Sequence, residues 1–266
     1  CAALAAQLGH EDTGCRVLCL RVLGNITAGS EAHTQHVLDA GVLATLVDLF
    51  VDADLTVRKE AAWVASNVAA GSDTQIAALL TTPGLVASLA RMACQAEWAV
   101  RREAGWAIVN TILCGAPSHI DQLSGLAPCV GILCELLSIE DVALLSATLD
   151  ALEIVLELGG RRAALQVEAN RGLDALTDLQ LHTAADLVAD KARDIVEDFF
   201  SQDDDDDLED SDDEEDLAFF AGGVDADLHM SDAGTVHAAA GGATSAGRPQ
   251  FCFVSDPALS THRDGH

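Results

Sequence analysis

The sequence predicts an all-α solenoid of stacked helical repeats followed by an acidic tail. Three observations predict it: an Ala- and Leu-rich composition, helical segments that recur at a fixed spacing, and an abrupt change of composition after residue 200. Aromatic residues make up only 4% and Tyr is absent. Such a composition favours helices, because sheets are rich in aromatic and β-branched residues.

The repeat is visible in three segments, "RVLGNITAGS" at 21–30, "AAWVASNVAAGS" at 61–72 and "AGWAIVNTILCG" at 104–115. Their Asn residues lie 42 and 43 positions apart, and two Trp residues lie 43 apart. A period of ~40–47 residues with all-helical units is typical of armadillo or HEAT repeats. One unit cannot bury its apolar face alone, so the units are expected to stack.

Each unit is predicted to hold a short helix, a glycine turn, a second helix, a polar loop and a longer third helix. The glycines that open the second helices are Gly41, Gly84, Gly125 and Gly172. The third helices are predicted at 12–28, 55–70, 98–114, 141–158 and 184–200, where apolar residues recur at steps of three and four. The repeat domain is therefore predicted to cover 1–200, with a partial first repeat followed by about four more.

Residues 201–266 form the predicted tail. Twelve carboxylates fall within 203–216, and Gly, Ala, Ser and Asp fill most of the rest. Like charges repel and little apolar area is available, so the tail is expected to be disordered. A solubilising role is the simplest interpretation. Ser201 and Ser211 precede acidic runs, which leaves open a role as acceptors for an acid-directed kinase.

The formal net charge of −29 is shared between the repeats and the tail. Such a field repels nucleic acids and anionic membranes and attracts basic partners, so neither nucleic acid nor membrane is an expected partner. No apolar run approaches the ~20 residues that a membrane-spanning helix needs.

The sequence does not predict an enzyme, a cofactor or a metal site. None of the eight Cys forms a C-x-x-C pair, and most fall in apolar helical runs. This favours a reducing compartment over a disulfide framework, which is the alternative. H-E-x-x-H and phosphate-binding glycine motifs are absent from the sequence. A hydrolase or redox enzyme on a helical solenoid would need a clustered polar site, which the sequence does not show.

The residues that carry chemistry are two Trp–Asn pairs. Trp63 precedes Asn67 by four residues and Trp106 precedes Asn110 by four, so each pair shares a helix face. An Asn amide can hold a peptide backbone by donating and accepting one hydrogen bond each. Two indoles one repeat apart form a slot for a Lys or Arg stem. A glutamate lies three residues before each Trp, placed to meet the cationic head.

The segments "RVLGNITAG", "VRKEAAWVASNVAAG" and "VRREAGWAIVN", with "LDAGVLATLVDLF", "GLDALTDLQLH" and "ARDIVEDFF", resemble importin alpha (karyopherin alpha) over about 1–200. The resemblance implies a right-handed armadillo superhelix and a nuclear import adaptor that binds Lys/Arg-rich nuclear localisation signals of cargo proteins. It places the minor signal site in these repeats. The residues assigned to it are Trp63, Asn67, Trp106, Asn110, Glu60, Glu103, Asn25, Arg21 and Thr34.

The resemblance also implies partners and a location. Importin beta is expected to bind through an amino-terminal segment missing here, and a nuclear export receptor through the last repeats. The protein is expected to shuttle between cytoplasm and nucleus. The alternative is a catenin-like armadillo scaffold for signalling or adhesion. The grooves of such scaffolds are typically basic, so the acidic balance and the Trp–Asn ladder argue against it.

Overall fold

A computed structural model of the chain describes residues 1–182 and 185–201. Within these residues every regular element is a helix, which confirms the predicted fold class. The helices are α1 (Ala2–Gln7), α2 (Thr13–Thr27), α3 (Glu31–Leu38), α4 (Val42–Leu49), α5 (Leu55–Ala69), α6 (Asp73–Thr81), α7 (Leu85–Gln95), α8 (Trp98–Cys114), α9 (Pro117–Leu126), α10 (Cys129–Leu136), α11 (Val142–Ala169), α12 (Gly172–His182) and α13 (Asp186–Phe200). The tail predicted at 201–266 lies, apart from Ser201, outside the described residues.

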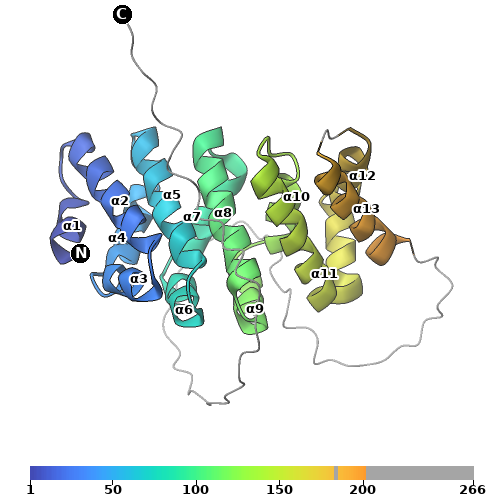
Figure 1. The fold of residues 1–266 in the computed structure, drawn as a ribbon, viewed down its shortest axis with the longest axis horizontal. Coiled ribbons are helices and arrows are strands. Elements are labelled where there is room, and N and C mark those ends of the chain that lie inside the picture. Colours follow the sequence, from blue (N-terminus) through green and yellow to red (C-terminus); the bar gives the residue numbers. More distant parts are fainter. Residues whose placement is uncertain (183–184, 202–266) are drawn as a thin grey trace, which may run out of the picture.

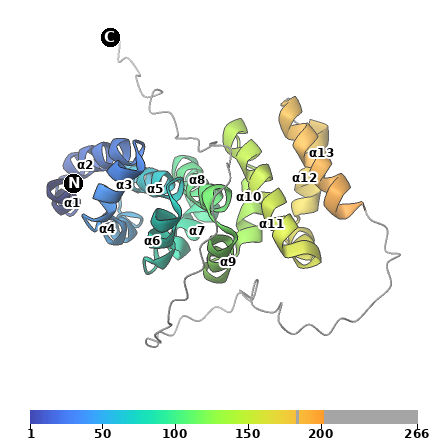
Figure 2. The ribbon, with the colours of Figure 1, turned by 60° about the horizontal axis from the view of Figure 1, so that its bottom comes forward.

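The helices form three parallel stacks along an elongated molecule (Figures 1 and 2). The third helices pack in the order α2, α5, α8, α11 and α13. The second helices α4, α7, α10 and α12 form another stack, and the first helices α3, α6 and α9 form the last. Each helix therefore meets its counterparts in the neighbouring repeats, as a solenoid requires.

The third helices begin where the sequence places them, and an aspartate explains three of the starts. Asp12, Asp54 and Asp141 are the N-cap residues of α2, α5 and α11. Each accepts hydrogen bonds from backbone N–H groups of the first turn at 2.7–3.1 Å. These carboxylates satisfy donors that the helix leaves without partners. The predicted and observed bounds of α2, α5 and α8 differ by no more than one residue.

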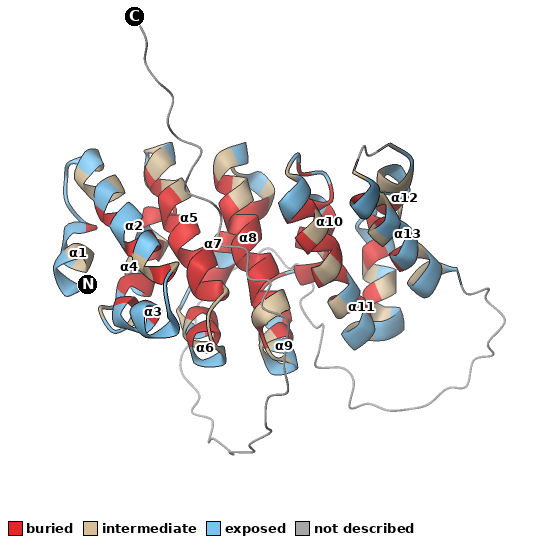
Figure 3. Cartoon of the chain, viewed as in Figure 1, coloured by how far each residue is buried: buried red, intermediate tan, exposed pale blue. Residues whose placement is uncertain are grey.

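Helices α5 and α8 form the centre of the core (Figure 3). Residues 60–69 of α5 and 103–112 of α8 are buried without interruption, so neither helix keeps a polar stripe over this stretch. Third helices on both sides and second helices behind cover them. Small residues make this possible: Ala61, Ala62 and Ala65 are fully buried.

The boundary between the last two repeats lies at Gly160. The third helix predicted at 141–158 is the first part of α11, which is broken at Gly160, whose φ is 49° and ψ is −139°. The part of α11 after this break, which ends at Ala169, takes the place of the first helix of the final repeat. Gly172 is the first residue of α12, but Arg171 before it takes the positive φ of 59°.

The prediction that Gly125 opens a second helix is wrong. Gly125 lies inside α9, and α10 begins at Cys129, directly after Pro128. Pro128 is the N-cap residue of α10, so this helix begins without a glycine in the left-handed conformation. Gly41 and Gly84 do take the left-handed conformation, with φ of 75° and 76°, and are the N-cap residues of α4 and α7.

This difference predicts opposite effects of the same substitution at two glycines that both have room for a Cβ. Gly41→Ala should lower the free energy of unfolding by about 1 kcal/mol, because φ is positive. Gly125→Ala, which is exposed and helical, should raise it by about 0.5 kcal/mol. Urea unfolding followed by circular dichroism measures both. Destabilisation by Gly125→Ala would show that this residue forms a turn after all.

Candidate functional site

The predicted site residues occupy matching positions on adjacent third helices. Trp63 is the ninth residue of α5 and Trp106 the ninth of α8, while Asn67 and Asn110 are the thirteenth. The sixth residue is Glu60 in α5 and Glu103 in α8. Because α5 and α8 pack side by side, the repeated positions form one ladder along the third-helix stack, called here the Trp–Asn ladder.

The indoles of the ladder are packed into the protein. Trp63 is 7% exposed and Trp106 is 3% exposed. The ring of Trp63 lies against Gly24 of α2, where a Cβ would come within 2.1 Å of the ring. Because Gly24 has no side chain, the Trp63 ring can pack directly against the backbone of α2. Little of either ring therefore remains exposed in this structure.

The asparagines tie consecutive third helices together. Asn67 donates through Nδ2 to the Gly24 carbonyl at 3.1 Å, and Asn110 donates to the Ser66 carbonyl at 3.1 Å. Gly24 is the twelfth residue of α2 and Ser66 the twelfth of α5, so the same bond recurs one repeat later. The Nδ2 group of each asparagine is thus engaged in a hydrogen bond within the fold. The buried Oδ1 of Asn110 has no hydrogen-bond partner within the described residues.

Thr27 joins this network, although nothing in the sequence pattern singled it out. Its hydroxyl accepts a hydrogen bond from Asn67 at 3.3 Å, and its carbonyl accepts one from the Thr34 hydroxyl at 3.1 Å. Thr34 is 3% exposed and its hydroxyl is engaged inside the fold. The structure therefore brings Thr34 and Asn67 together through Thr27. The contact was not predictable from the local sequence pattern, because Thr27 and Asn67 are separated by 40 positions in the chain.

The two glutamates already hold cations of the chain itself. Glu60 Oε1 lies 3.0 Å from Arg21 Nε and 3.2 Å from Lys59 Nζ. Glu103 Oε1 lies 2.7 Å from Arg102 NH1. The other oxygen of Glu103, Oε2, is buried and has no hydrogen-bond partner within the described residues. Burial raises the pKa of the Glu103 carboxyl, and the nearby Arg102 opposes that rise.

The first repeat supplies the remaining predicted residues. Arg21 is the ninth residue of α2, where the next two repeats carry Trp, and its side chain is 47% exposed. Asn25 is the thirteenth residue of α2 and is exposed. Arg21 joins the ladder through its ion pair with Glu60. Asn25 is not engaged like Asn67 and Asn110, since no earlier third helix lies beside it in the described residues.

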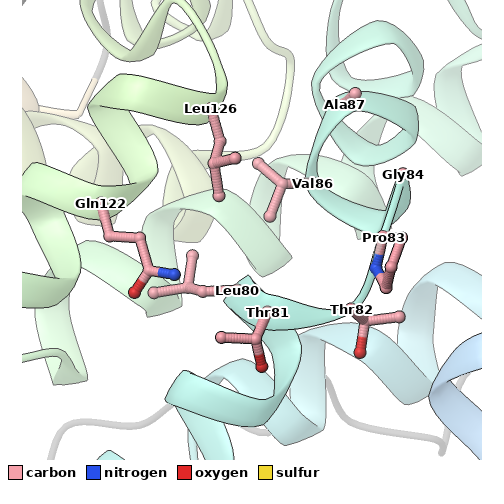
Figure 4. A pocket seen from close by; sticks show the side chains of 9 residues that line it. All are labelled: Leu80, Thr81, Thr82, Pro83, Gly84, Val86, Ala87, Gln122 and Leu126. Atoms are coloured by element: carbon pink, nitrogen blue, oxygen red, sulfur yellow. The ribbon is translucent and has the colours of Figure 1, made fainter. Parts of the chain in front are cut away.

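One surface pocket lies apart from the ladder. It has a volume of about 340 Å³ and lies between the α6–α7 turn and α9 (Figure 4). Its lining is mostly apolar and comprises Leu80, Thr81, Thr82, Pro83, Gly84, Val86, Ala87, Gln122 and Leu126. No predicted site residue lines it, and it offers no charged group to hold a ligand.

Two other kinds of arrangement, a cluster of metal ligands and a single membrane-spanning helix, are absent from the described part of the chain. No group of three or more His, Cys, Asp or Glu there is arranged to hold a metal ion. No single helix there has the length and hydropathy to cross a membrane; only α6 and α7 taken together, bent by 86°, meet that test.

Known families match two separate parts of the chain. Residues 30–70 match the armadillo/beta-catenin-like repeat, and residues 161–216 match an atypical armadillo repeat. The second match begins just after the break in α11 at Gly160.

Two curated relatives are importin alpha subunits of plants. Importin subunit alpha-1a of Oryza sativa subsp. japonica is 35% identical over 81 residues, which are 30% of this chain and 15% of that protein. Importin subunit alpha-7 of Arabidopsis thaliana is 38% identical over 64 residues, 24% of this chain and 12% of that protein. The matches thus span less than a sixth of either relative's length.

Solved structures resemble the whole repeat region. A designed armadillo repeat protein in complex with the peptide (KR)4 superposes with a TM-score of 0.64 and 28% identity, covering 74% of this chain and 81% of that one. Computationally designed armadillo repeat proteins for modular peptide recognition give 0.63 and 27%, covering 72% and 78%. The chain therefore has the armadillo-repeat fold. Over the matched stretches it is similar to importin alpha subunits.

The contact between Trp63 and Gly24 predicts a strong coupling between the two residues. Gly24→Ala should lower the free energy of unfolding by about 2 kcal/mol, because the new methyl meets a rigid buried ring. In a Trp63→Ala background the same change should cost less than about 0.5 kcal/mol, since Ala is the better helix former. Chemical unfolding of the four proteins of this cycle measures the coupling. Equal costs in both backgrounds would refute the contact.

Proposed function

We propose that the Trp–Asn ladder of α5 and α8 binds extended Lys/Arg-rich peptides and that the protein is a nuclear import adaptor for cargo bearing such signals. One observation carries the proposal: Glu103 Oε2 and Asn110 Oδ1 are buried acceptors without partners within the described residues, on the same helix as Trp106. Buried polar atoms are nearly always paired in folded proteins. A ligand that donates hydrogen bonds supplies the missing partners.

The chemistry of the two atoms selects the ligand. An ionised carboxylate only accepts hydrogen bonds, so Glu103 Oε2 suits an ammonium or guanidinium group. Asn110 Oδ1 also only accepts and suits a peptide N–H. Asn110 Nδ2 is already bonded to Ser66, so the ligand meets the acceptor side of the amide alone. An extended peptide with a basic side chain offers both donors.

The tryptophans complete the site once a ligand enters. A cation over an indole gains about 0.5–2 kcal/mol. The aliphatic stem of Lys or Arg also covers apolar ring surface. Trp63 and Trp106 lie one repeat apart on adjacent helices, a distance that an extended peptide covers in about three residues. The ladder therefore suits basic residues placed at intervals along the peptide.

Long-range charge supports the same ligand class. The whole chain carries −29, which attracts cationic peptides and repels acidic ones. The designed armadillo protein that superposes on this chain is itself a complex with (KR)4, a peptide of alternating Lys and Arg. A catenin-like scaffold that takes acidic partners is the competing function, and its ligands would meet this field unfavourably.

The cellular role follows from the likeness to importin alpha subunits. Cargo signals would be bound in the cytoplasm and released in the nucleus. Importin beta and a nuclear export receptor are the partners for the two directions, the latter at the last repeats, α11 to α13.

The proposal predicts a loss of peptide binding when both ladder tryptophans are replaced. Trp63→Leu/Trp106→Leu should weaken binding of a fluorescent Lys/Arg-rich peptide by at least about tenfold, since two cation–ring contacts are lost. Fluorescence anisotropy at ~150 mM salt measures it, because that salt screens non-specific attraction.

Trp98→Leu is the matched control. Trp98 is the first residue of α8 and is 53% exposed, outside the ladder, so its replacement should leave binding unchanged. Circular dichroism melts confirm that each variant is folded. Unchanged binding by the folded double variant, or preference for an acidic peptide, would favour the scaffold function.

Glu103 predicts a pH dependence of binding. Because burial raises its pKa, this carboxyl takes up a proton at a higher pH than an exposed glutamate does. The neutral acid no longer attracts a cation, so affinity should fall as pH is lowered from about 7.5 to about 5. Glu103→Gln should bind more weakly at neutral pH and lose most of this dependence.

Glu97→Gln removes the same charge just before α8 and is the control. The pKa of Glu97 is lowered by a hydrogen bond from its own backbone amide and by Arg58, so Glu97 stays ionised across this range. Its replacement should leave the slope of affinity against pH as in the unmodified protein. An unchanged slope in Glu103→Gln would show that another group controls the pH response.

A further inference from the structure

The Trp–Asn ladder is bounded at each end by an ion pair between consecutive third helices. At one end Arg21 of α2 meets Glu60 of α5. At the other end Lys191 of α13 meets Asp150 of α11. Both pairs join the ninth residue of one third helix to the sixth residue of the next. The contact is the same at both ends, but the charges are exchanged.

The exchanged charges place an acidic group in a tryptophan position. Asp150 is the ninth residue of α11, matching Trp106 one repeat earlier and Trp63 two repeats earlier. The ladder positions therefore continue onto α11 with a carboxylate in place of an indole. At this ladder position a carboxylate can bind a cation, as the indoles can at the two preceding positions.

Lys191 fills this position with the chain's own ammonium group. Its Nζ donates to Asp150 Oδ1, to Ser146 Oγ at 3.0 Å and to the Ser146 carbonyl at 3.4 Å. All three acceptors belong to α11, so this helix supplies a complete ammonium site. The side chain of Lys191 is 26% exposed and that of Asp150 is 44% exposed. The site therefore lies at the surface, within reach of a ligand.

The surroundings of the site are acidic. Glu153, which lies one turn after Asp150 on α11, is influenced by the charges of Glu157, Asp150 and Asp198, and Lys191 is the cation that acts on it. The pKa of the Glu153 carboxyl is raised, first by burial and then by Glu157, Asp150 and Asp198. An arriving lysine would thus meet a favourable field once Lys191 is removed.

We propose that Lys191 occupies a third cation subsite of the peptide groove and so ends the groove after Trp106. This inference rests on the proposed function of the ladder. The subsite consists of Asp150 Oδ1, Ser146 Oγ and the Ser146 carbonyl, and its ligand is the ammonium group of a peptide lysine. Lys191 acts as a tethered competitor that limits recognition to peptides whose basic residues fit the two indoles.

The experiment compares one short and two longer basic peptides on the whole 266-residue chain. The short peptide carries basic residues for the two indoles only. The long peptides carry one more lysine three residues beyond either end, because one repeat matches about three residues of extended chain. Anisotropy gives the affinity ratio of long to short for the unmodified protein, for Lys191→Met and for Arg193→Met.

Arg193→Met is the matched control. Arg193 lies on the same helix, pairs with Asp190 three residues earlier and is 50% exposed. Its loss changes the net charge by the same amount as the loss of Lys191, so non-specific attraction rises equally in both. Only Lys191→Met frees Asp150 and Ser146.

The unmodified protein and Arg193→Met should bind the long and short peptides within about twofold. Lys191→Met should bind one of the long peptides about three- to fivefold more tightly than the short one, as for a partly exposed ion pair. Adding Asp150→Asn to Lys191→Met should return the ratio to about one.

Three results would overturn the inference. The first is an unchanged ratio in folded Lys191→Met while the short peptide binds normally, which leaves the proposed function intact. The second is a preference for a long peptide already in the unmodified protein. The third is absence of any binding of the short peptide to the unmodified protein, which removes the proposed function as well.

Discussion

The structure depends on the contact between one third helix and the next. At each step from α2 to α8, an asparagine amide donates to a carbonyl of the preceding helix, and at the first step an indole lies on Gly24 as well. These bonds fix the rotation of each helix about its axis, because residues nine and thirteen must face the preceding helix. Once the rotation of each third helix is fixed, its ninth and thirteenth residues line up with those of the neighbouring third helices. A ladder of identical groups is thus a consequence of how the repeats stack.

The residues that stack the repeats also make up the proposed site, and this limits the groups that they can offer to a ligand. Asn110 donates its N–H to Ser66 and keeps only an acceptor for a ligand. Trp106 contributes most of its ring to the core. The proposed site would therefore recognise a ligand by the hydrogen bonds that the ligand donates. Replacing these residues would affect stability and binding together, so the two have to be measured separately.

The sequence predicted the third helices and the ladder because both depend on local periodicity. Trp63 and Trp106 stand out by their spacing, and the helix starts follow from aspartate caps. Contacts between repeats were not predictable in this way: Lys191 reaches Asp150 across 41 residues, and Thr27 reaches Asn67 across 40. The prediction for Gly125 was wrong because glycine occurs in helices as well as in turns. Only the φ angle, which the sequence does not give, distinguishes these two settings.

Ion pairs within the chain reduce the number of carboxylates that are available to a basic ligand. Glu60 and Asp150 each hold a cation of the chain, so a peptide that binds there exchanges one ion pair for another and gains little net energy. Glu103 differs, since one of its oxygens has no partner in the described residues although it is buried. Desolvation of that oxygen is a cost that the free protein already bears, so a donor that reaches it gains more than it would at an exposed carboxylate. In the proposed function, the local field at Glu103, rather than the total charge of −29, would therefore distinguish a basic peptide that fits the ladder from one that is merely attracted to the surface.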